Sequence, residues 1–512
     1  MSILKEDDLD FAKLHIEKYY DSDFFPKPID FGALWASWDE VKKELLSKNV
    51  NKLTISTPRI LAAPKPSGTF RVVHQLDPMD CLVYTALVSS ICDKVEAARP
   101  PSAARIACSY RIEKKDGSFF ASGTGYPEFT ERTEELAQQF AWVLSLDISD
   151  FYNQIYLHRI QNAVEFVDGQ SKVIADDIEY FLTALNSKVS QGIPVGPAAS
   201  IVLAEAILLD VDNFITSNGV KHTRYVDDFR IFGSSREQLE WLLRNLTIYL
   251  YENHRLSIAT EKTRIHVSAE YVSEELHNSD AEEREDILDD LDIFGPYLQD
   301  VEEADEDGAE TASVGGEQDS MIDAVLSAAK TLEGSRTLDL GVARATIRTA
   351  RRLSIKELVD YILKNFCFYA PVASDVFIYL DAISDAEFVK GIIGKVEAAL
   401  KLNCTEHDFL RYWFTWYLSR HLKKFNSQLL RVFVYESPWL ELVAIAAVED
   451  NNLPWIRGYK NKISDHTPRE RRALIYAGRI LPADEREAWL KNVINNSVSK
   501  FDIWMAKWVL TL

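Results

Sequence analysis

The sequence has few cysteines and no long apolar segment. Only five of its 512 residues are cysteine, and none of them form the CxxC pattern of a metal or redox site. The cysteines are Cys81, Cys92, Cys108, Cys367 and Cys404. This usage predicts free thiols in a reducing compartment. The acidic start, MSILKEDDLDF, has no apolar region of a secretory signal, and no apolar run is long enough to span a membrane. We therefore expect a cytoplasmic protein without membrane contact.

An excess of positive charge is also missing. The chain has 57 Lys and Arg against 79 Asp and Glu, a net charge of −22. Residues 274–319 hold nineteen Asp or Glu and one Arg, so this segment carries −18 and the rest of the chain carries −4. The composition predicts a solvated acidic linker, at least partly disordered, over residues 274–320. A segment that mimics nucleic acid and shields a basic groove is the alternative interpretation.

The most informative segment is HTRYVDDFRIFG, in which polar and apolar residues nearly alternate on both sides of Asp227 and Asp228. This pattern predicts two short strands joined by a tight turn. Two carboxylates at such a tip suit a hard divalent cation, because Mg²⁺ prefers oxygen ligands. A pair of Asp residues in a turn is otherwise common turn chemistry.

A third carboxylate lies about eighty residues upstream, in FAWVLSLDISDFYNQIYLHRI. Residues 142–146 are apolar enough for a buried strand, with Asp147 at its end, and Asp150 is a candidate cap for the following helix. Three carboxylates brought together can hold two metal ions, which clamp the attacking and leaving oxygens of a phosphoryl displacement. We therefore predict that Asp147, Asp227 and Asp228 hold Mg²⁺ or Mn²⁺.

Five segments in the same order resemble the motifs of reverse transcriptases. LDISDFYNQIY is similar to their A motif, SQGIPVGP (residues 190–197) to the B motif, YVDD to the C motif, LSIATEKTRIHV to the D motif, and PKPSGTFRVV to the fingers hairpin. The resemblance covers about residues 60–270. It implies an RNA-directed DNA polymerase family, deoxynucleotide substrates and a DNA product.

Lys65 and Arg71 flank the turn of the expected fingers hairpin. One cation on each arm could grip a triphosphate, the Arg as a fork and the Lys as a point charge. Lys262 stands at the family's lysine position and could protonate the pyrophosphate leaving group. The alternative for each of these residues is a solvated surface side chain.

Tyr152 lies five residues after Asp147, where the family carries a bulky ring that excludes a ribose 2′-hydroxyl. Gln191 and Gly192 precede an apolar helix, ASIVLAEAILLDV. Glycine allows the backbone to come close to a base or sugar. These three residues are therefore predicted to contact the incoming nucleotide.

Beyond about residue 320 the apolar residues recur at three- and four-residue spacing through several segments, which predicts an all-α domain of helical-repeat or solenoid-like type. A polymerase followed by such a domain is similar to the bacterial abortive-infection (Abi) reverse transcriptases, especially the type of phage P2 prophages. That resemblance implies a bacterial anti-phage enzyme that works without a template, primes on its own polypeptide and assembles as a trimer or hexamer. Tyr19 and Tyr20 are candidate priming residues by this analogy.

The predicted fold class is α+β, with fingers and palm of reverse-transcriptase type before the helical domain. The expected domains are residues 1–140 (N-terminal helices and fingers), 141–273 (palm), 274–320 (linker) and 321–512 (HEAT-like helices). Two other functions remain open: a conventional RNA-templated enzyme of retron or group II type, and a non-catalytic interaction scaffold. A helical thumb after the D motif would favour the former, whereas the chain has its acidic segment there.

Overall fold

The computed structural model describes residues 4–20, 24–123, 125–169, 172–277, 287 and 315–512. The chain divides into two compact units. Unit 1 comprises Met1–Ser22, Leu45–Arg59 and His74–Thr311, and unit 2 comprises Asp23–Glu44, Ile60–Val73 and Ala312–Leu512. Residues 23–44 and 60–73 thus group with the C-terminal helices, a division that differs from the boundaries expected from the sequence. Most of the expected linker lies outside the described residues.

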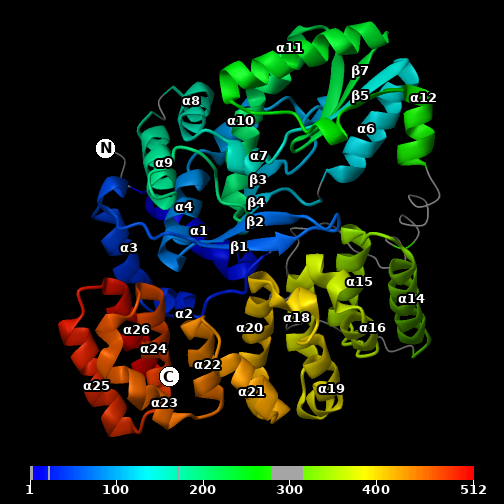
Figure 1. Cartoon of the computed structure of the whole chain (residues 1–512). Coiled ribbons are helices and arrows are strands. Elements are labelled where there is room, and N and C mark those ends of the chain that lie inside the picture. Colours follow the sequence, from blue (N-terminus) through cyan, green and yellow to red (C-terminus); the bar gives the residue numbers. More distant parts are fainter. Residues whose placement is uncertain (1–3, 21–23, 124, 170–171, 278–286, 288–314) are drawn as a thin grey trace. The chain divides into compact units, whose positions relative to one another are not determined.

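Unit 1 contains a four-stranded sheet and a two-stranded hairpin, surrounded by helices (Figure 1). The strands are β3 (Ile112–Lys115), β4 (Ser118–Phe120), β5 (Trp142–Asp147), β6 (Lys221–Tyr225), β7 (Asp228–Gly233) and β8 (Arg264–Val267). The helices are α1 (Glu6–Tyr19), α4 (Pro78–Ser89), α5 (Cys92–Ala98), α6 (Tyr126–Gln139), α7 (Phe151–Gln154), α8 (Leu157–Val167), α9 (Lys172–Leu185), α10 (Ala198–Ser217), α11 (Arg236–His254) and α12 (Ser268–Tyr271).

The sheet has the strand order β6-β7-β5-β8, and every neighbouring pair is antiparallel. Residues alternate between its two faces. Val143 and Phe232 face one side, where they pack with Leu136 of α6 and Tyr271 of α12. The opposite face packs on α10 and α11. Both faces are therefore covered by helices, while the strand ends remain available for chemistry.

Unit 2 combines the hairpin of β1 (Arg59–Pro64) and β2 (Phe70–Gln75) with helices. The helices are α2 (Asp30–Ala36), α3 (Trp38–Leu46), α14 (Gly315–Gly334), α15 (Leu340–Arg352), α16 (Leu358–Lys364), α17 (Phe366–Tyr369), α18 (Ala373–Ile383), α19 (Ala386–Ala399), α20 (Asp408–Phe425), α21 (Gln428–Tyr435), α22 (Leu440–Glu449), α23 (Leu453–Tyr459), α24 (Pro468–Ala477), α25 (Ala483–Asn496) and α26 (Lys500–Thr511). Residues 315–512 contain no strand, in agreement with the expected all-α region.

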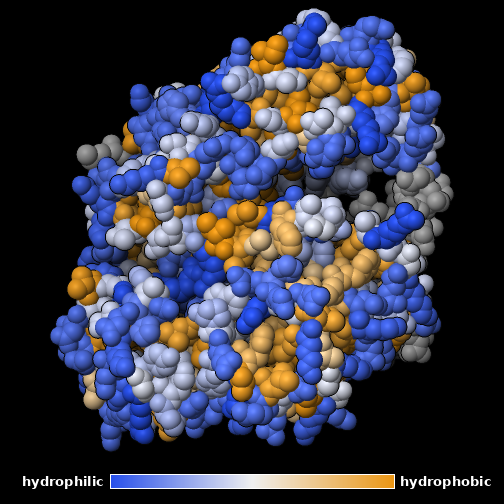
Figure 2. All heavy atoms as spheres, in the orientation of Figure 1, coloured by the Kyte–Doolittle hydropathy of each residue, from blue (hydrophilic) through white to orange (hydrophobic). Residues whose placement is uncertain are grey.

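Alternate helices of unit 2 pack in a row: α15, α18, α20, α22, α24 and α26 each contact the next. Hydrophilic residues cover most of the outer surface of these helices in the view of Figure 2, as expected for amphipathic helices whose apolar sides are buried. The aromatic residues Tyr412, Trp413, Phe414 and Tyr417 of α20 are at most 3% exposed. They form part of the core and do not offer a surface for stacking bases.

The expectation that no apolar run is long enough to span a membrane does not hold by length and composition, because the stretch Phe366–Ile383 meets both criteria. Within the described residues it is the one such stretch, and 61% of it is buried inside the protein. Burial of this extent is what a core helix shows as well.

The expectation of five free thiols is wrong for two cysteines. Cys367, in α17, and Cys404, in the short 3-10 helix Asn403–Glu406, form a disulfide with a Cα–Cα distance of 5.6 Å. Their 37-residue separation carries no spacing signal, because helix packing rather than a local turn brings them together. Cys81, Cys92 and Cys108 are free and buried.

Candidate active site

The predicted hairpin forms from β6 and β7, with Tyr225 paired to Asp228 and only Val226 and Asp227 in the turn. Val226 adopts a φ of 53°, which a β-branched side chain rarely does. Its side chain is nevertheless buried, in a cluster with Tyr110 and Ile201. Backbone strain of this kind persists only where the surroundings impose it. The turn that carries Asp227 is therefore held by the tertiary structure.

Asp147 ends β5, as predicted, and lies directly opposite Asp228 in the register of β5 with β7. Asp227 follows in the adjoining turn. The structure thus places all three carboxylates at one end of the sheet, although about eighty residues separate Asp147 from the other two.

Lys262 lies beside the first of these carboxylates. Its Nζ donates a hydrogen bond to Asp147 Oδ2 at 2.8 Å, and the backbone N–H of Ala259 donates to the Asp147 carbonyl oxygen at 2.8 Å. The segment before β8 is therefore pinned to the end of β5. Burial alone would lower the pKa of Lys262, but the hydrogen bond to Asp147 and the charges of the three carboxylates raise it.

Asp228 is paired differently. Arg230, on the same face of β7, donates from both terminal nitrogens to the two Asp228 oxygens, the longer bond being 3.0 Å. The Arg230 Nε also donates to the Tyr271 hydroxyl at 2.5 Å, and its guanidinium lies 5.4 Å from the Phe129 ring centroid. Asp228 consequently has less freedom than Asp227 to accept another ligand.

The pKa of Asp227 is the one most affected by the proximity of the three carboxylates. Burial and the charge of Asp147, with a smaller contribution from Asp228, raise the pKa of Asp227 to about 7. Lys262 opposes this rise but does not cancel it. The site is therefore short of positive charge around the half-buried Asp227 carboxylate.

A divalent cation fits these three carboxylates, because they offer only oxygen ligands and because no positive charge of the described residues fully compensates Asp227. Among the described residues, no group of three or more His, Cys, Asp or Glu side chains already surrounds an ion-sized position. Two of the three carboxylates are paired with cationic side chains: Asp147 with Lys262, and Asp228 with Arg230. Asp147 and Asp227 are the residues that would hold an ion, with Asp228 beside them.

A buried ionic network lies on the opposite face of the hairpin. Arg224, in β6, is fully buried and donates to both oxygens of Asp212 and of Glu205 at 2.8–3.1 Å. His222 lies 3.1 Å from Asp212, and Arg99 lies 3.0 Å from Glu205. Burial alone would raise the pKa of Asp212, but the charge and hydrogen bonds of Arg224 and a hydrogen bond from His222 lower it to about 2.

This network reaches the turn through two hydrogen bonds. Arg224 donates to the Val226 carbonyl oxygen at 3.2 Å. The hydroxyl of Ser109 accepts from the Val226 N–H at 2.8 Å and donates to Glu205 at 3.2 Å. The unusual conformation of Val226 is thus fixed through hydrogen bonds to both its N–H and its carbonyl oxygen.

The sequence analysis missed Ser109, Arg224 and their partners. One signal was available: Glu205 and Asp212 lie seven residues apart in a largely apolar helix, so they share a helix face. Buried acids on one face require a buried cation or donors. The identity of that cation could not be inferred, because Arg224 belongs to another element.

The comparison of sequences agrees with this geometry. Residues 63–285 match the sequence profile of the family described as reverse transcriptase (RNA-dependent DNA polymerase). This stretch is a reverse transcriptase domain. Domains of this family belong to the RNA-directed DNA polymerases, act on nucleotides and nucleic acid, and use divalent metals such as Mg²⁺. The match covers just under half of the chain.

No curated protein matches the sequence at a significant level. Solved structures with a similar arrangement include apo telomerase from Candida tropicalis, with 10% identity, a TM-score of 0.35, and coverage of 74% of this chain and 72% of that one. Telomerase from Candida albicans with a telomeric RNA fragment has 10% identity, a TM-score of 0.34, and coverage of 71% and 65%.

Two of the predicted nucleotide-binding residues, Tyr152 and Gln191, lie within the reverse transcriptase domain. The half-buried Tyr152 packs against the cluster that contains Val226. Gln191 forms a bridge with Tyr156, and its Nε2 donates to Gln154 Oε1 at 2.8 Å. The segments of the A and B motifs are thus joined.

Gly192 needs its lack of a side chain. It has a φ of +91°, and a Cβ there would lie 3.3 Å from the Asn153 carbonyl oxygen. Asp150 does not cap the following helix: it adopts a left-handed conformation, makes no side-chain cap and accepts a hydrogen bond from Asn153 Nδ2 at 2.8 Å. That expectation was wrong because the segment turns sharply after Asp147 before the helix begins.

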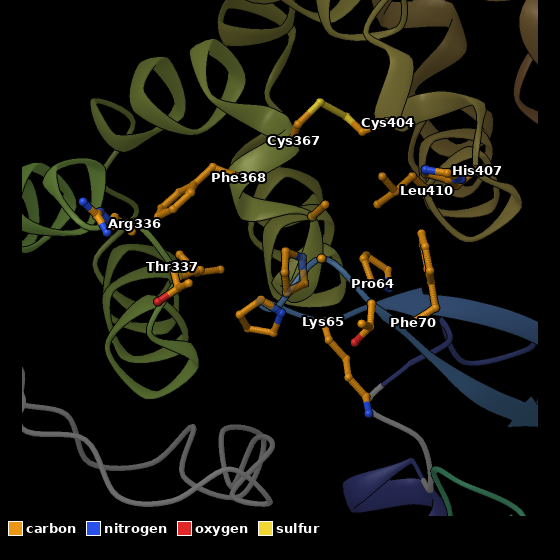
Figure 3. Close-up of a pocket in the computed structure, with 16 residues that line it drawn as sticks. Pro64, Lys65, Phe70, Arg336, Thr337, Cys367, Phe368, Cys404, His407 and Leu410 are labelled. Atoms are coloured by element: carbon orange, nitrogen blue, oxygen red, sulfur yellow. A yellow bond between two sulfur atoms is a disulfide. The ribbon is translucent and has the colours of Figure 1, made fainter. Parts of the chain in front are cut away.

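Lys65 and Arg71 belong to unit 2 of the protein. Lys65 lies on the hairpin turn and lines a pocket with residues of the C-terminal helices (Figure 3). Arg71 is exposed on β2. Their contact with a triphosphate therefore stays a prediction.

The two candidate priming residues occur at the end of α1. Tyr19 is the last residue of the helix, and its ring centroid lies 5.6 Å from that of His15. Burial, with the nearby charge of Asp116, raises the pKa of Tyr19. The Tyr20 hydroxyl accepts a hydrogen bond from Gln75 Nε2 at 3.4 Å. Both hydroxyl-bearing side chains are half-buried.

Proposed function

We propose that this protein is a DNA polymerase that joins deoxynucleotides in its reverse transcriptase domain. The observation that carries the proposal is the meeting of Asp147, Asp227 and Asp228 at one end of the sheet, with Asp147 paired to Asp228 in register. Bound Mg²⁺ or Mn²⁺ would neutralise the phosphate charge and polarise the reacting oxygens.

The residues of the chain have separable tasks in this reaction. Asp147 and Asp227 would hold the cation, while Arg230 holds Asp228 in place. Lys262, whose Nζ lies 2.8 Å from Asp147 Oδ2, is the group that supplies a proton to the departing pyrophosphate oxygen. The buried network behind the turn keeps Asp227 at its position.

The direct test is incorporation of labelled dNTPs by the purified protein with Mg²⁺, in three parallel reactions: without primer or template, with a primed RNA template, and with a primed DNA template. Incorporation in any of them supports the polymerase. Its absence in all three, with Mn²⁺ tried as well, would favour the non-catalytic scaffold.

Sugar selection provides a finer test. Tyr152 packs beside the Val226 turn. By analogy with the family, we expect its ring to exclude a ribose 2′-hydroxyl. Tyr152→Ala is expected to raise incorporation of rNTP relative to dNTP by at least about tenfold, because the smaller side chain removes the steric block. Single-nucleotide incorporation measures the ratio, and Tyr152→Phe is the matched control. An unchanged ratio in Tyr152→Ala would contradict this role.

The finer part of the proposal concerns priming and biological role. The resemblance to the Abi enzymes, together with the all-α region that follows the reverse transcriptase domain, supports a bacterial cytoplasmic anti-phage polymerase that works without a template and as an oligomer. A hydroxyl already tethered to the protein would avoid the entropic cost of recruiting a primer. We expect the first nucleotide to be joined to a hydroxyl of this chain, with Tyr19 and Tyr20 as candidates.

Mass spectrometry of the protein after synthesis identifies such a bond. A nucleotide-modified tyrosine peptide is expected, and Tyr19→Phe and Tyr20→Phe serve as matched variants. Free DNA with no modified peptide would exclude self-priming and favour the templated enzyme, which the RNA-dependent description of the family supports. Light scattering on the same sample tests the expected trimer or hexamer.

A further inference from the structure

A pocket of about 220 Å³ lies within unit 2, between the hairpin turn and the C-terminal helices. The turn Pro64–Phe70 forms one side and the Cys367–Cys404 disulfide stands at another (Figure 3). Arg336 and Phe368 project on one flank, and Phe70 with His407 on the other (Figure 3). The catalytic carboxylates are not part of it.

The ionisable side chains that line this pocket are all basic. Its ionisable side chains other than the disulfide are Lys65, Arg336 and His407, and no Asp or Glu lines it in the described part of the chain. This contrasts with a net charge of −22 for the whole protein. A ligand with a negative group is therefore favoured.

Two phenylalanines supply flat apolar surfaces beside these cations. Phe70 is 47% exposed, and its ring meets the His407 ring edge-on with a centroid distance of 5.2 Å. Phe368 is half-buried on the opposite flank. The two rings thus give the pocket apolar surface on both flanks of its cations.

The turn leaves room beside its lysine. Lys65 N–H donates to the Thr69 carbonyl oxygen at 2.8 Å, which closes the turn. Gly68 has a φ of +77°, and a Cβ built there meets no atom within 4 Å. A phosphate could therefore approach the turn without displacing protein atoms.

Cations that follow a backbone and aromatic rings that accept bases are the combination by which proteins bind unpaired nucleic-acid strands. The volume is below that of pockets for drug-sized ligands and suits a single base with its phosphate. A duplex would not enter, because its bases are stacked and paired. We propose that this pocket binds one nucleotide unit of a single DNA strand, with Phe368 or Phe70 against the base and Arg336 and Lys65 on the phosphate. This inference rests on the proposed polymerase function, which brings single-stranded DNA to the protein.

The test measures binding rather than catalysis. Fluorescence anisotropy of a short labelled oligothymidylate is recorded with full-length Asp227→Asn protein, without dNTPs or divalent metal. Phe368→Leu is expected to weaken binding about tenfold, because it keeps an apolar side chain but removes the ring. Arg336→Gln is expected to reduce the slope of log affinity against log salt by about one.

Arg352→Gln is the matched control: it removes an exposed cation of α15 that does not line the pocket, and it should change neither quantity. Thermal unfolding of each variant verifies the fold, and Phe368→Leu keeps the test valid if Arg336→Gln is unstable. Oligonucleotide binding that both pocket variants leave unchanged would overturn the site.

A parallel titration with labelled dTTP separates a strand from a free nucleotide. If the pocket variants weaken dTTP binding but not oligonucleotide binding, the assignment to a strand is wrong. An inactive wild-type protein that still binds the oligonucleotide through this pocket would refute the polymerase and leave the site standing. Normal polymerisation together with unaltered oligonucleotide binding in the pocket variants would refute the pocket site and leave the polymerase standing.

Discussion

Asp227→Asn is expected to lower nucleotide incorporation by at least about a thousandfold, equivalent to about 4 kcal/mol of transition-state stabilisation. The substitution keeps the size of the side chain but removes the charge that a divalent cation needs. Because partial burial and the like charges of Asp147 and Asp228 raise the pKa of Asp227 to about 7, the neutral amide should leave the folded state intact or stabilise it slightly. Steady-state incorporation and thermal unfolding measure the two effects.

Asp147→Asn should behave like Asp227→Asn, whereas Asp228→Asn should cost less because Arg230 already occupies both oxygens of Asp228. Glu240→Gln provides the matched control. This side chain is 53% exposed in an ion pair with Arg236 on α11, away from the sheet end, and its loss should leave the rate unchanged. Near wild-type rates for Asp227→Asn would show that the three carboxylates do not form the catalytic centre.

Arg224→Met should destabilise unit 1 by about 3–5 kcal/mol, because it leaves Glu205 and Asp212 buried without their cation. Because methionine fills much of the same volume, the loss of stability measures the missing positive charge rather than a change in packing. Denaturant unfolding followed by far-UV circular dichroism measures it. Arg236→Gln removes an exposed arginine that is 52% accessible and should change stability by less than about 1 kcal/mol. Equal stability of the two variants would contradict the role of the network.

Ser109→Ala separates positioning from stability. It removes one acceptor for the Val226 N–H and should cost only about 1 kcal/mol of stability. If the network positions the turn, the turnover rate should nevertheless fall about tenfold while the KM for dNTP changes little, since a small misplacement of Asp227 affects the reacting geometry. Loss of stability without loss of rate would assign Ser109 a purely structural role.

The local parts of the candidate site were predictable from the sequence. The β6–β7 hairpin follows from alternation around a two-residue turn, and Asp147 follows from the end of an apolar strand. These features depend on a few neighbouring residues, so their pattern is visible in the chain. The all-α character of residues 315–512 follows equally from the spacing of apolar residues.

Features that depend on distant contacts could not be predicted in the same way. The partner of Glu205 and Asp212 is Arg224 of another element, and Ser109 approaches the turn from 117 residues away. The Cys367–Cys404 bond arises from the packing of two helical segments. Asp150 was expected to cap a helix, but the sharp turn after Asp147 gives it a left-handed conformation instead.

The amino-acid sequence was enough to predict the candidate groups: three carboxylates, a lysine and a tyrosine at the spacing of a reverse transcriptase. The environment of these groups is a property of the folded chain. Register places Asp147 opposite Asp228, burial raises the pKa of Asp227, and the network around Arg224 fixes Val226 in its unusual conformation. Folding also groups the hairpin that carries Lys65 with the C-terminal helices. The physical reason is that residue type and spacing are local properties, whereas desolvation, ion pairing and packing depend on segments far apart in the chain.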